Sequence, residues 1–139
     1  MRIITTSIFT LFTVICLHAQ LFNFGVGTGI VFSDQTAFGP QIRLQYNMDE
    51  RFNMAASYNY YITKDSGSAF DFDLRYKLFQ IGNVRINPMA GIGYRNPGGV
   101  NLNVGLVTEI PQNSFLIYIE PKFIIDETVF FALTGGILF

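Results

Sequence analysis

Residues 69–79, AFDFDLRYKLF, decide the fold of this chain. In this stretch large apolar side chains alternate with charged ones: Phe70, Asp71, Phe72, Asp73, Leu74, Arg75, Tyr76, Lys77 and Leu78. Successive side chains of a β-strand point to opposite faces of the sheet, whereas a helix would scatter both sets around its surface. The pattern therefore predicts a strand with one apolar face and one charged face.

The composition extends this pattern to the whole chain. The chain has 139 residues, enough for one domain, and only 14% are charged, against about 25% in a typical soluble domain. After the first twenty residues, no apolar run reaches the roughly 18 residues of a membrane helix. Hydrophobicity that comes only in alternation is typical of membrane β-strands. The net charge of −1 gives no electrostatic reason to expect a nucleic-acid partner.

The first part of the chain has the features of a signal peptide. Arg2 is a short positive segment, residues 3–17 are largely apolar, and Ala19 is a small residue at the expected cleavage position. We therefore predict a signal peptide at residues 1–19 and an outer-membrane β-barrel domain at residues 20–139.

Two other interpretations of this leader are less well matched. An N-terminal membrane anchor requires a longer apolar run. A lipoprotein signal at Cys16 does not fit the bulky Ile15 before it. Without the leader the chain has no cysteine and no histidine, since Cys16 and His18 are the only ones. We therefore predict no disulfide framework, no thiolate metal site and no cofactor.

The rest of the chain divides into alternating segments separated by turn signals. We predict eight strands, at residues 21–32, 41–49, 51–62, 69–79, 84–95, 100–110, 114–125 and 129–139. Residues 33–40 and 64–68 are predicted loops, and Gly82-Asn83 a two-residue hairpin turn. Each strand is close to the roughly 9 to 11 residues that cross a bilayer. The predicted fold is all-β, an eight-stranded antiparallel up-and-down transmembrane barrel.

The orientation of the two faces is the main choice. A soluble lipocalin-like barrel would turn the apolar face inward, but that face holds more large groups than an eight-stranded interior accepts. The polar face also carries glycines within strands, which suit a cramped interior: Gly25, Gly27, Gly29, Gly91, Gly93, Gly105 and Gly136. The apolar face has no charged residue, and Arg or Lys at the bilayer midplane costs about 2 to 4 kcal/mol. We therefore predict that the apolar face meets lipid.

Aromatic residues and prolines add detail to this prediction. Aromatic side chains gather near the strand ends, as in the two aromatic girdles of membrane barrels. Pro88 and Pro121 fall inside strands, on the lipid face, and each removes a donor from the sheet. We predict a bulge or bend at each proline.

The charged face is predicted to form a paired network in the lumen, because buried charges must be paired to be tolerated. Its predicted members are Arg43, Asp71, Asp73, Arg75, Lys77, Arg85, Arg95, Glu109, Glu120 and Lys122. Asp71 and Asp73 alternatively form an acid–base pair or bind a cation. The glycines either only ease strand twist, or leave a narrow water-filled lumen or ligand pocket near residues 25–29 and 91–93.

The chain resembles the small eight-stranded outer-membrane barrels of the OmpA/OmpX type over residues 20–139. The end TVFFALTGGILF, residues 128–139, is similar to the C-terminal signal read by the barrel-assembly machinery, with Leu133, Ile137 and Phe139 at its apolar positions. This resemblance implies a monomer in the outer membrane of a Gram-negative bacterium, in contact with lipid. The loops are shorter than those of relatives known for adhesion, which argues against an adhesive role.

Enzymes on this architecture often use a histidine to activate water or serine, and the only histidine here is His18 in the leader. We therefore predict a non-catalytic structural role in the envelope. The alternative is a porin-like binding or transport barrel that takes a small or apolar ligand through its lumen or lateral face.

Overall fold

The computed structural model describes residues 21–62 and 67–139. The predicted signal peptide and part of the loop at residues 64–68 lie outside these residues. The described chain is all-β, with strands β1 (Phe22–Phe32), β2 (Ala37–Asn47), β3 (Phe52–Tyr61), β4 (Gly67–Tyr76), β5 (Phe79–Ile81), β6 (Val84–Asn96), β7 (Gly99–Pro111), β8 (Leu116–Ile125) and β9 (Val129–Leu138). Within these residues, no helix has the length and apolar character needed to cross a membrane.

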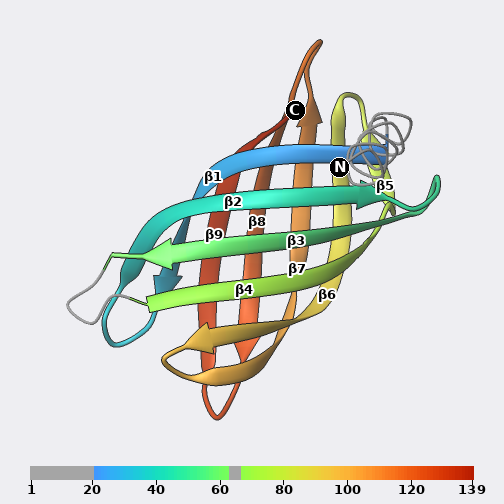
Figure 1. Ribbon diagram of the computed structural model, residues 1–139. Helices are drawn as coiled ribbons and strands as arrows, with labels where there is room; N and C mark the ends of the chain where they lie inside the picture. The colour runs from blue at the N-terminus through green and yellow to red at the C-terminus, as the bar shows by residue number, and fades with distance from the viewer. Residues whose placement is uncertain (1–20, 63–66) are drawn as a thin grey trace, which may run out of the picture.

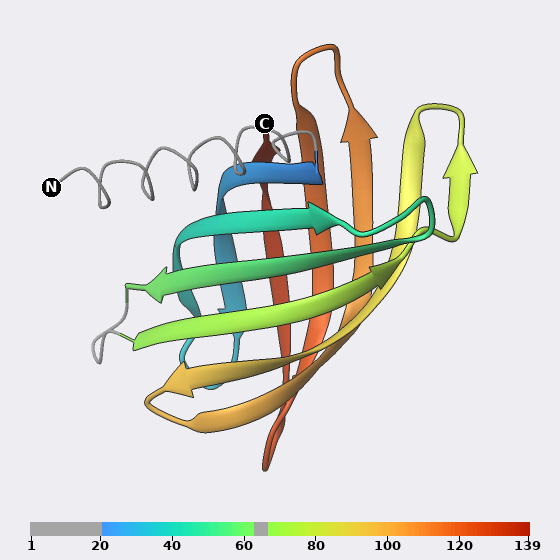
Figure 2. The ribbon, with the colours of Figure 1, turned by 45° about the vertical axis from the view of Figure 1, so that its right-hand side comes forward.

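The strands form one closed antiparallel barrel (Figures 1 and 2). Each strand pairs with its neighbour in sequence, β1 also pairs with β9, and β4 pairs with β6, so the sheet returns on itself. β5 has only three residues and pairs with β6 beyond the end of β4. Eight long strands therefore make the wall, which confirms the predicted up-and-down eight-stranded barrel.

The pairing register fixes the tilt of the strands. A path from each residue to its partner on the next strand starts at Phe22 and closes at Phe32, ten residues further along β1. It passes through Tyr46, Met54, Leu74, Ala90, Val104, Phe123 and Phe131. With about 3.3 Å per residue and about 4.8 Å between strands, this stagger tilts the strands by about 40° and makes the wall about 25 Å tall. That height matches the apolar band of outer-membrane barrels.

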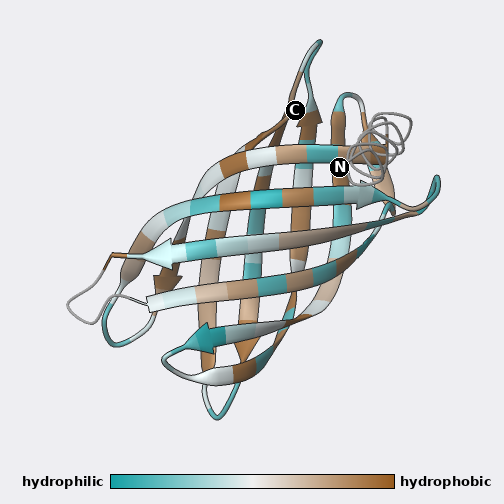
Figure 3. Ribbon diagram, viewed as in Figure 1, coloured by the Kyte–Doolittle hydropathy of each residue, from teal (hydrophilic) through white to brown (hydrophobic). Residues whose placement is uncertain are grey.

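The outer face is apolar, as predicted from the alternation. Figure 3 shows hydrophobic and hydrophilic residues alternating along the strands. Most residues of the path just described are exposed, such as Val104 at 47%, and Tyr46 and Met54 are half-buried. Paired aromatic rings mark both ends of the band. The ring centres of Phe22 and Tyr46 lie 4.9 Å apart at the end where the described chain starts at residue 21 and finishes at residue 139, which we call the termini end. Those of Phe32 and Phe131 lie 5.8 Å apart at the opposite, loop end. The lipid-facing band therefore has an aromatic border on each side.

One predicted loop is shorter than expected. β2 begins at Ala37, so Gly39 and Pro40 belong to the strand and only residues 33–36 connect β1 to β2. Gly39 faces the inside, and a Cβ there would collide with the carbonyl group of Tyr60 on β3. The glycine is thus required by a close approach of two strands. The sequence signal for a turn was misleading at this position.

The predicted strand at residues 69–79 is in fact two strands separated by a bulge. Arg75 pairs with Met89 and Phe79 pairs with Ile86, so residues 76–78 oppose only two residues, 87–88. The extra residue turns both Leu78 and Phe79 outward, which interrupts the alternation. The bulge lies opposite Pro88, which has no N–H to offer the neighbouring strand.

The register shows no bulge at Pro121, where a bulge or bend was predicted. The register of β8 against β9 stays constant through the Pro121–Leu133 pair. On the other side, pairing with β7 is interrupted between Lys122 and Ile119 but resumes in the same register. The missing N–H of this proline thus costs local ladder bonds without shifting the strand.

A charge placed on the outer face tests its orientation. Val104 lies midway along β7 and faces outward, whereas Ile81, 70% exposed, lies at the tip of β5 beside the Gly82 turn. We expect Val104→Arg to lower the free energy of unfolding in lipid vesicles by about 2 to 4 kcal/mol, and Ile81→Arg by about 0 to 1 kcal/mol. Denaturant titration of the refolded variants measures both values. Equal, small losses would show that Val104 does not face the acyl chains.

Candidate functional site

The interior of the barrel contains charged and polar side chains between two apolar clusters. The cluster at the loop end consists of Val31, Tyr61, Ala69, Ile124 and Ala132. The cluster toward the termini end consists of Met89, Val107, Tyr118 and Leu138. The sequence analysis predicted a polar lumen and missed these apolar residues. Between the clusters the interior is filled by buried ionic groups, which bound the candidate site.

Glu120 on β8 lies at the centre of the ionic groups. Its Oε2 atom is 2.8 Å from Nη2 of Arg43 on β2 and accepts a hydrogen bond of 2.6 Å from Nη2 of Arg75 on β4. All three side chains are fully buried. Arg75 also donates to Gln45 Oε1 at 2.7 Å and lies 3.8 Å from Glu109 Oε1 on β7. One carboxylate on β8 therefore links two arginines, from β2 and β4, on the other side of the barrel.

Lys122, two residues further along β8, is the second centre. Its Nζ atom donates to Asp71 Oδ2 at 2.9 Å and lies 3.8 Å from Asp73 Oδ2 and 3.6 Å from Glu120 Oε1. Asn103 Nδ2 donates to both aspartates, to Asp71 Oδ1 at 2.9 Å and to Asp73 Oδ1 at 3.1 Å. The aspartate pair thus faces one ammonium and one amide. The contacts are those of a neutralised ionic cluster, which fits a structural role better than acid–base catalysis.

A chain of hydrogen bonds joins this cluster to the termini end. Asn59 donates to Asp71 at 3.3 Å, Gln41 donates to Asn59 at 2.9 Å, and the Tyr118 hydroxyl donates to Gln41 at 2.6 Å. The Arg43 guanidinium also lies 4.2 Å from the centre of the Tyr118 ring. Tyr118 therefore connects the charged layer with the apolar cluster below it.

The structure brings together seven of the ten residues predicted for the lumen network: Arg43, Asp71, Asp73, Arg75, Glu109, Glu120 and Lys122. It places the other three near the ends of the barrel. Lys77 donates to the carbonyl oxygen of Asp49 at 3.1 Å, Arg95 lies 5.9 Å from the centre of the Tyr61 ring, and Arg85 lines a pocket. None of these three forms an ion pair with an acid of the described residues.

Glycines make room for the large interior side chains. A Cβ on Gly27 would lie 2.6 Å from the Tyr118 hydroxyl, and one on Gly136 would lie 2.7 Å from it. A Cβ on Gly93 would meet Asp71 and lie 2.6 Å from Asn101 Oδ1. The space beside these glycines is thus already filled by protein. This favours a cramped interior over the alternative of a ligand pocket at residues 25–29 and 91–93.

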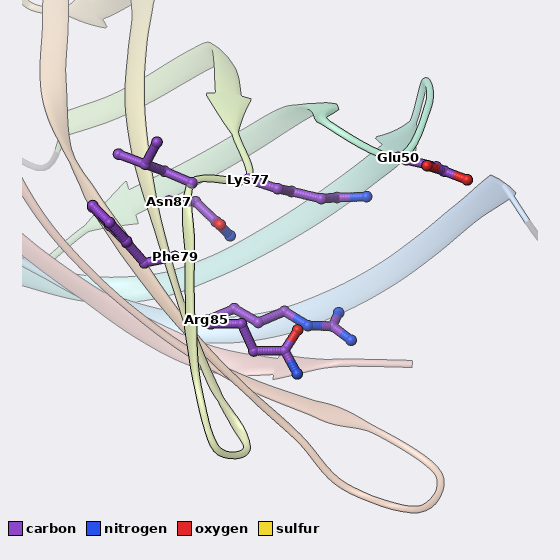
Figure 4. A pocket seen from close by; sticks show the side chains of 7 residues that line it. Glu50, Lys77, Phe79, Arg85 and Asn87 are labelled. Atoms are coloured by element: carbon purple, nitrogen blue, oxygen red, sulfur yellow. The ribbon is translucent and has the colours of Figure 1, made fainter.

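A pocket of about 400 Å³ opens at the termini end, beside the bulge between β4 and β5 (Figure 4). Lys77 and Arg85 extend into it on the side where Glu50 lies, and Phe79 points the other way. Asn87, which is fully buried, also lines the pocket and donates to Glu109 Oε2 at 3.1 Å. The pocket therefore reaches the ionic groups of the interior from outside. In the sequence, the bulge beside the pocket is marked by Leu78 and Phe79, two large apolar residues in succession.

The buried charges do not balance. Among the described residues the buried ionic set contains four acids, Asp71, Asp73, Glu109 and Glu120, and three bases, Arg43, Arg75 and Lys122. The same part of the chain contains no group of three or more His, Cys, Asp or Glu side chains placed to hold a metal ion. Removing one acid should therefore change the free energy of unfolding by a different amount than removing one base.

The comparisons with known proteins agree on the fold. The N-terminal β-barrel domain of Pseudomonas aeruginosa OprF matches with a TM-score of 0.61 at 16% identity, over 84% of this chain and 97% of that domain. Neisserial surface protein A matches with a TM-score of 0.56 at 11% identity, over 84% and 94%. A de novo designed transmembrane β-barrel matches with a TM-score of 0.67 at 10% identity, over 86% and 94%. Neither a family model nor a curated protein sequence matches the chain.

The unequal charge count predicts different outcomes for two interior substitutions. Lys122→Met leaves three acids, Asp71, Asp73 and Glu120, without the ammonium that they share. We expect it to lower the free energy of unfolding by about 3 to 5 kcal/mol. Asp73→Asn balances the charges and keeps an acceptor for Asn103, and we expect a loss of about 1 kcal/mol or less. Denaturant titration in detergent micelles measures both. A larger loss for Asp73→Asn than for Lys122→Met would contradict this description.

Proposed function

We propose that this chain is an integral protein of the bacterial outer membrane with a non-catalytic, structural role in the envelope. It has the fold of the small eight-stranded outer-membrane barrels. The observation that carries the proposal is the Arg43–Glu120–Arg75 contact, in which one buried carboxylate ties two arginines from other strands across the lumen. Side chains that are both large and bonded to each other close the interior and stiffen the wall.

Export and assembly belong to the same proposal. Residues 1–19 are the proposed signal peptide, and the last strand is the proposed signal for the barrel-assembly machinery. Leu133 and Ile137 point outward on β9, and Phe139, which follows the end of β9, is 61% exposed. The backbone of Phe139 also exchanges hydrogen bonds of 2.7 and 3.1 Å with Phe24 on β1, so the terminal residue takes part in closing the barrel. We expect the assembled barrel to be a monomer surrounded by lipid.

Conductance measurement tests the structural role. A barrel whose lumen is filled by its own side chains should give no steady ion current after refolding into planar bilayers. We expect current only when the filling is removed, so that the double variant Arg43→Ser, Tyr118→Ala conducts and the unaltered protein does not. Wild-type channels with stable conductance would instead support the transport alternative.

A second candidate, binding of an apolar ligand at the lateral face, is favoured by two shallow hollows on the outer wall. They measure about 240 and 290 Å³, and both are lined by Leu44 and Ala56. Ala56 pairs with Leu44 on β2 and with Phe72 on β4, so a small side chain lies between larger ones. Such a hollow accommodates an acyl chain or another slender apolar group.

Filling the hollow tests this second candidate. Ala56→Phe should abolish retention of a bound lipid when the protein is transferred from micelles into native mass spectrometry. Ala90→Phe, at another outward alanine, is the matched control because it pairs with the same strand β4 outside the hollow. Equal lipid retention in both variants and in the unaltered protein would dismiss a lateral binding site.

A further inference from the structure

We propose that the pocket at the termini end of the barrel, beside the β4–β5 bulge, binds a phosphate oxyanion through Lys77 and Arg85. This inference is independent of the structural role proposed above, because it does not depend on whether the lumen conducts.

The bulge creates the pocket. Up to Tyr76 the chain pairs with Phe52 on β3, and the Lys77 N–H still donates to Arg51 O at 2.7 Å. The next strand, β5 (Phe79–Ile81), pairs only with β6. The turn between β2 and β3 and the β5–β6 hairpin therefore separate at this point, and the pocket of about 400 Å³ lies between them. A phosphate group occupies a fraction of that volume, so the remainder of a larger ligand also fits.

The two cations point into this space. Gln80 and Arg85 are paired residues of β5 and β6, and Lys77 precedes the hairpin. Figure 4 shows the Lys77 and Arg85 side chains extending in the same direction into the pocket. A guanidinium presents a planar fork of donors to two phosphate oxygens, and an ammonium adds a point charge. The amides of Gln80 and Asn87 complete a polar lining.

The acids near these cations are engaged elsewhere. Glu109 is the direct cross-strand partner of Arg85, yet its carboxylate is turned to Asn87 at 3.1 Å and Arg75 at 3.8 Å. Asp49 accepts hydrogen bonds from the N–H groups of Arg51 and Phe52 at 2.6 and 2.7 Å. The bonds from Phe52 and Arg51 hold the pKa of the Asp49 carboxyl below its usual value, with a smaller effect of Lys77.

Glu50 is the one acid of the described residues that lines the pocket, and it is exposed. The lining therefore carries two positive charges and one negative charge.

The pocket also lies at the level of the Phe52–Tyr76 ring pair, which borders the apolar band. This is the depth of lipid headgroups, so the phosphate belongs either to a lipid or to a soluble ligand.

Titration with two sources of phosphate tests the proposal. The folded barrel, labelled with nitrogen-15 in a zwitterionic detergent, is titrated with inorganic phosphate, while chemical shifts of the Arg85 side chain and the Phe79 amide are followed. In a second arm the barrel is placed in phosphatidylcholine bicelles with increasing phosphatidic acid. Saturable shifts in the first arm support a soluble phosphate ligand, and saturable shifts in the second alone support a lipid headgroup.

Matched variants tie the binding to the pocket. Lys77→Gln and Arg85→Gln should each weaken binding about tenfold, as expected for the loss of one charge-assisted hydrogen bond. Glu50→Gln should strengthen it, because it removes the opposing charge. Arg51→Gln removes a nearby cation that does not line the pocket and should change binding less than twofold. Arg85→Lys, which keeps the charge, should bind more tightly than Arg85→Gln and guards against a folding defect.

The proposal is overturned if neither arm gives a saturable shift. It is also overturned if Arg51→Gln weakens binding as much as Arg85→Gln, because the effect is then a general charge effect of the barrel rim. The amide spectrum of each variant establishes that the barrel is folded before binding is compared.

Discussion

The narrow interior of the barrel is the constraint on which the rest of the structure depends. With eight long strands and a stagger of ten residues, from Phe22 to Phe32 around the wall, inward side chains from opposite walls touch. A charge in this space has no bulk water and must meet its counterion directly. The contact between Glu120 and Arg75 at 2.6 Å is the central case. Glycines such as Gly27 and Gly136 follow from the same crowding, since the Tyr118 hydroxyl occupies the space of their missing side chains.

The alternation of apolar and polar residues was enough to predict the eight long strands of the wall and the face that meets lipid. It was not enough to predict which charges meet. Lys122 and Asp71 are 51 residues apart in sequence and lie 2.9 Å from each other only because of the stagger. No local pattern encodes the stagger, since it is a property of the closed ring. For the same reason the alternation could not distinguish Lys77 and Arg85 from the residues of the network, since it predicted that all of them face the lumen.

Departures from strict alternation mark interior apolar residues that the sequence analysis missed, and they locate the bulge that it predicted at Pro88. Runs of three apolar residues, Ile30-Val31-Phe32 and Phe123-Ile124-Ile125, place one apolar side chain inside near a strand end, and Val31 and Ile124 belong to the loop-end cluster. Two successive apolar residues, Leu78 and Phe79, mark the bulge. In each case an interruption of the pattern has a physical reason, either the closing of the lumen or a missing backbone donor at Pro88. Such interruptions are therefore informative in their own right.

The likeness to a designed transmembrane barrel shows that this fold by itself does not specify a biological role. Residues that any barrel of this size needs, such as the outward aliphatic side chains and the inward glycines, are explained by the membrane and by packing. A role has to come from residues that the fold does not need. Lys77 and Arg85 are such residues. These two cations lie outside the buried network, point into an open pocket and form no ion pair with an acid of the described residues. Because they lie beside the bulge between β4 and β5, the termini end, rather than the lumen, is where we propose a binding role.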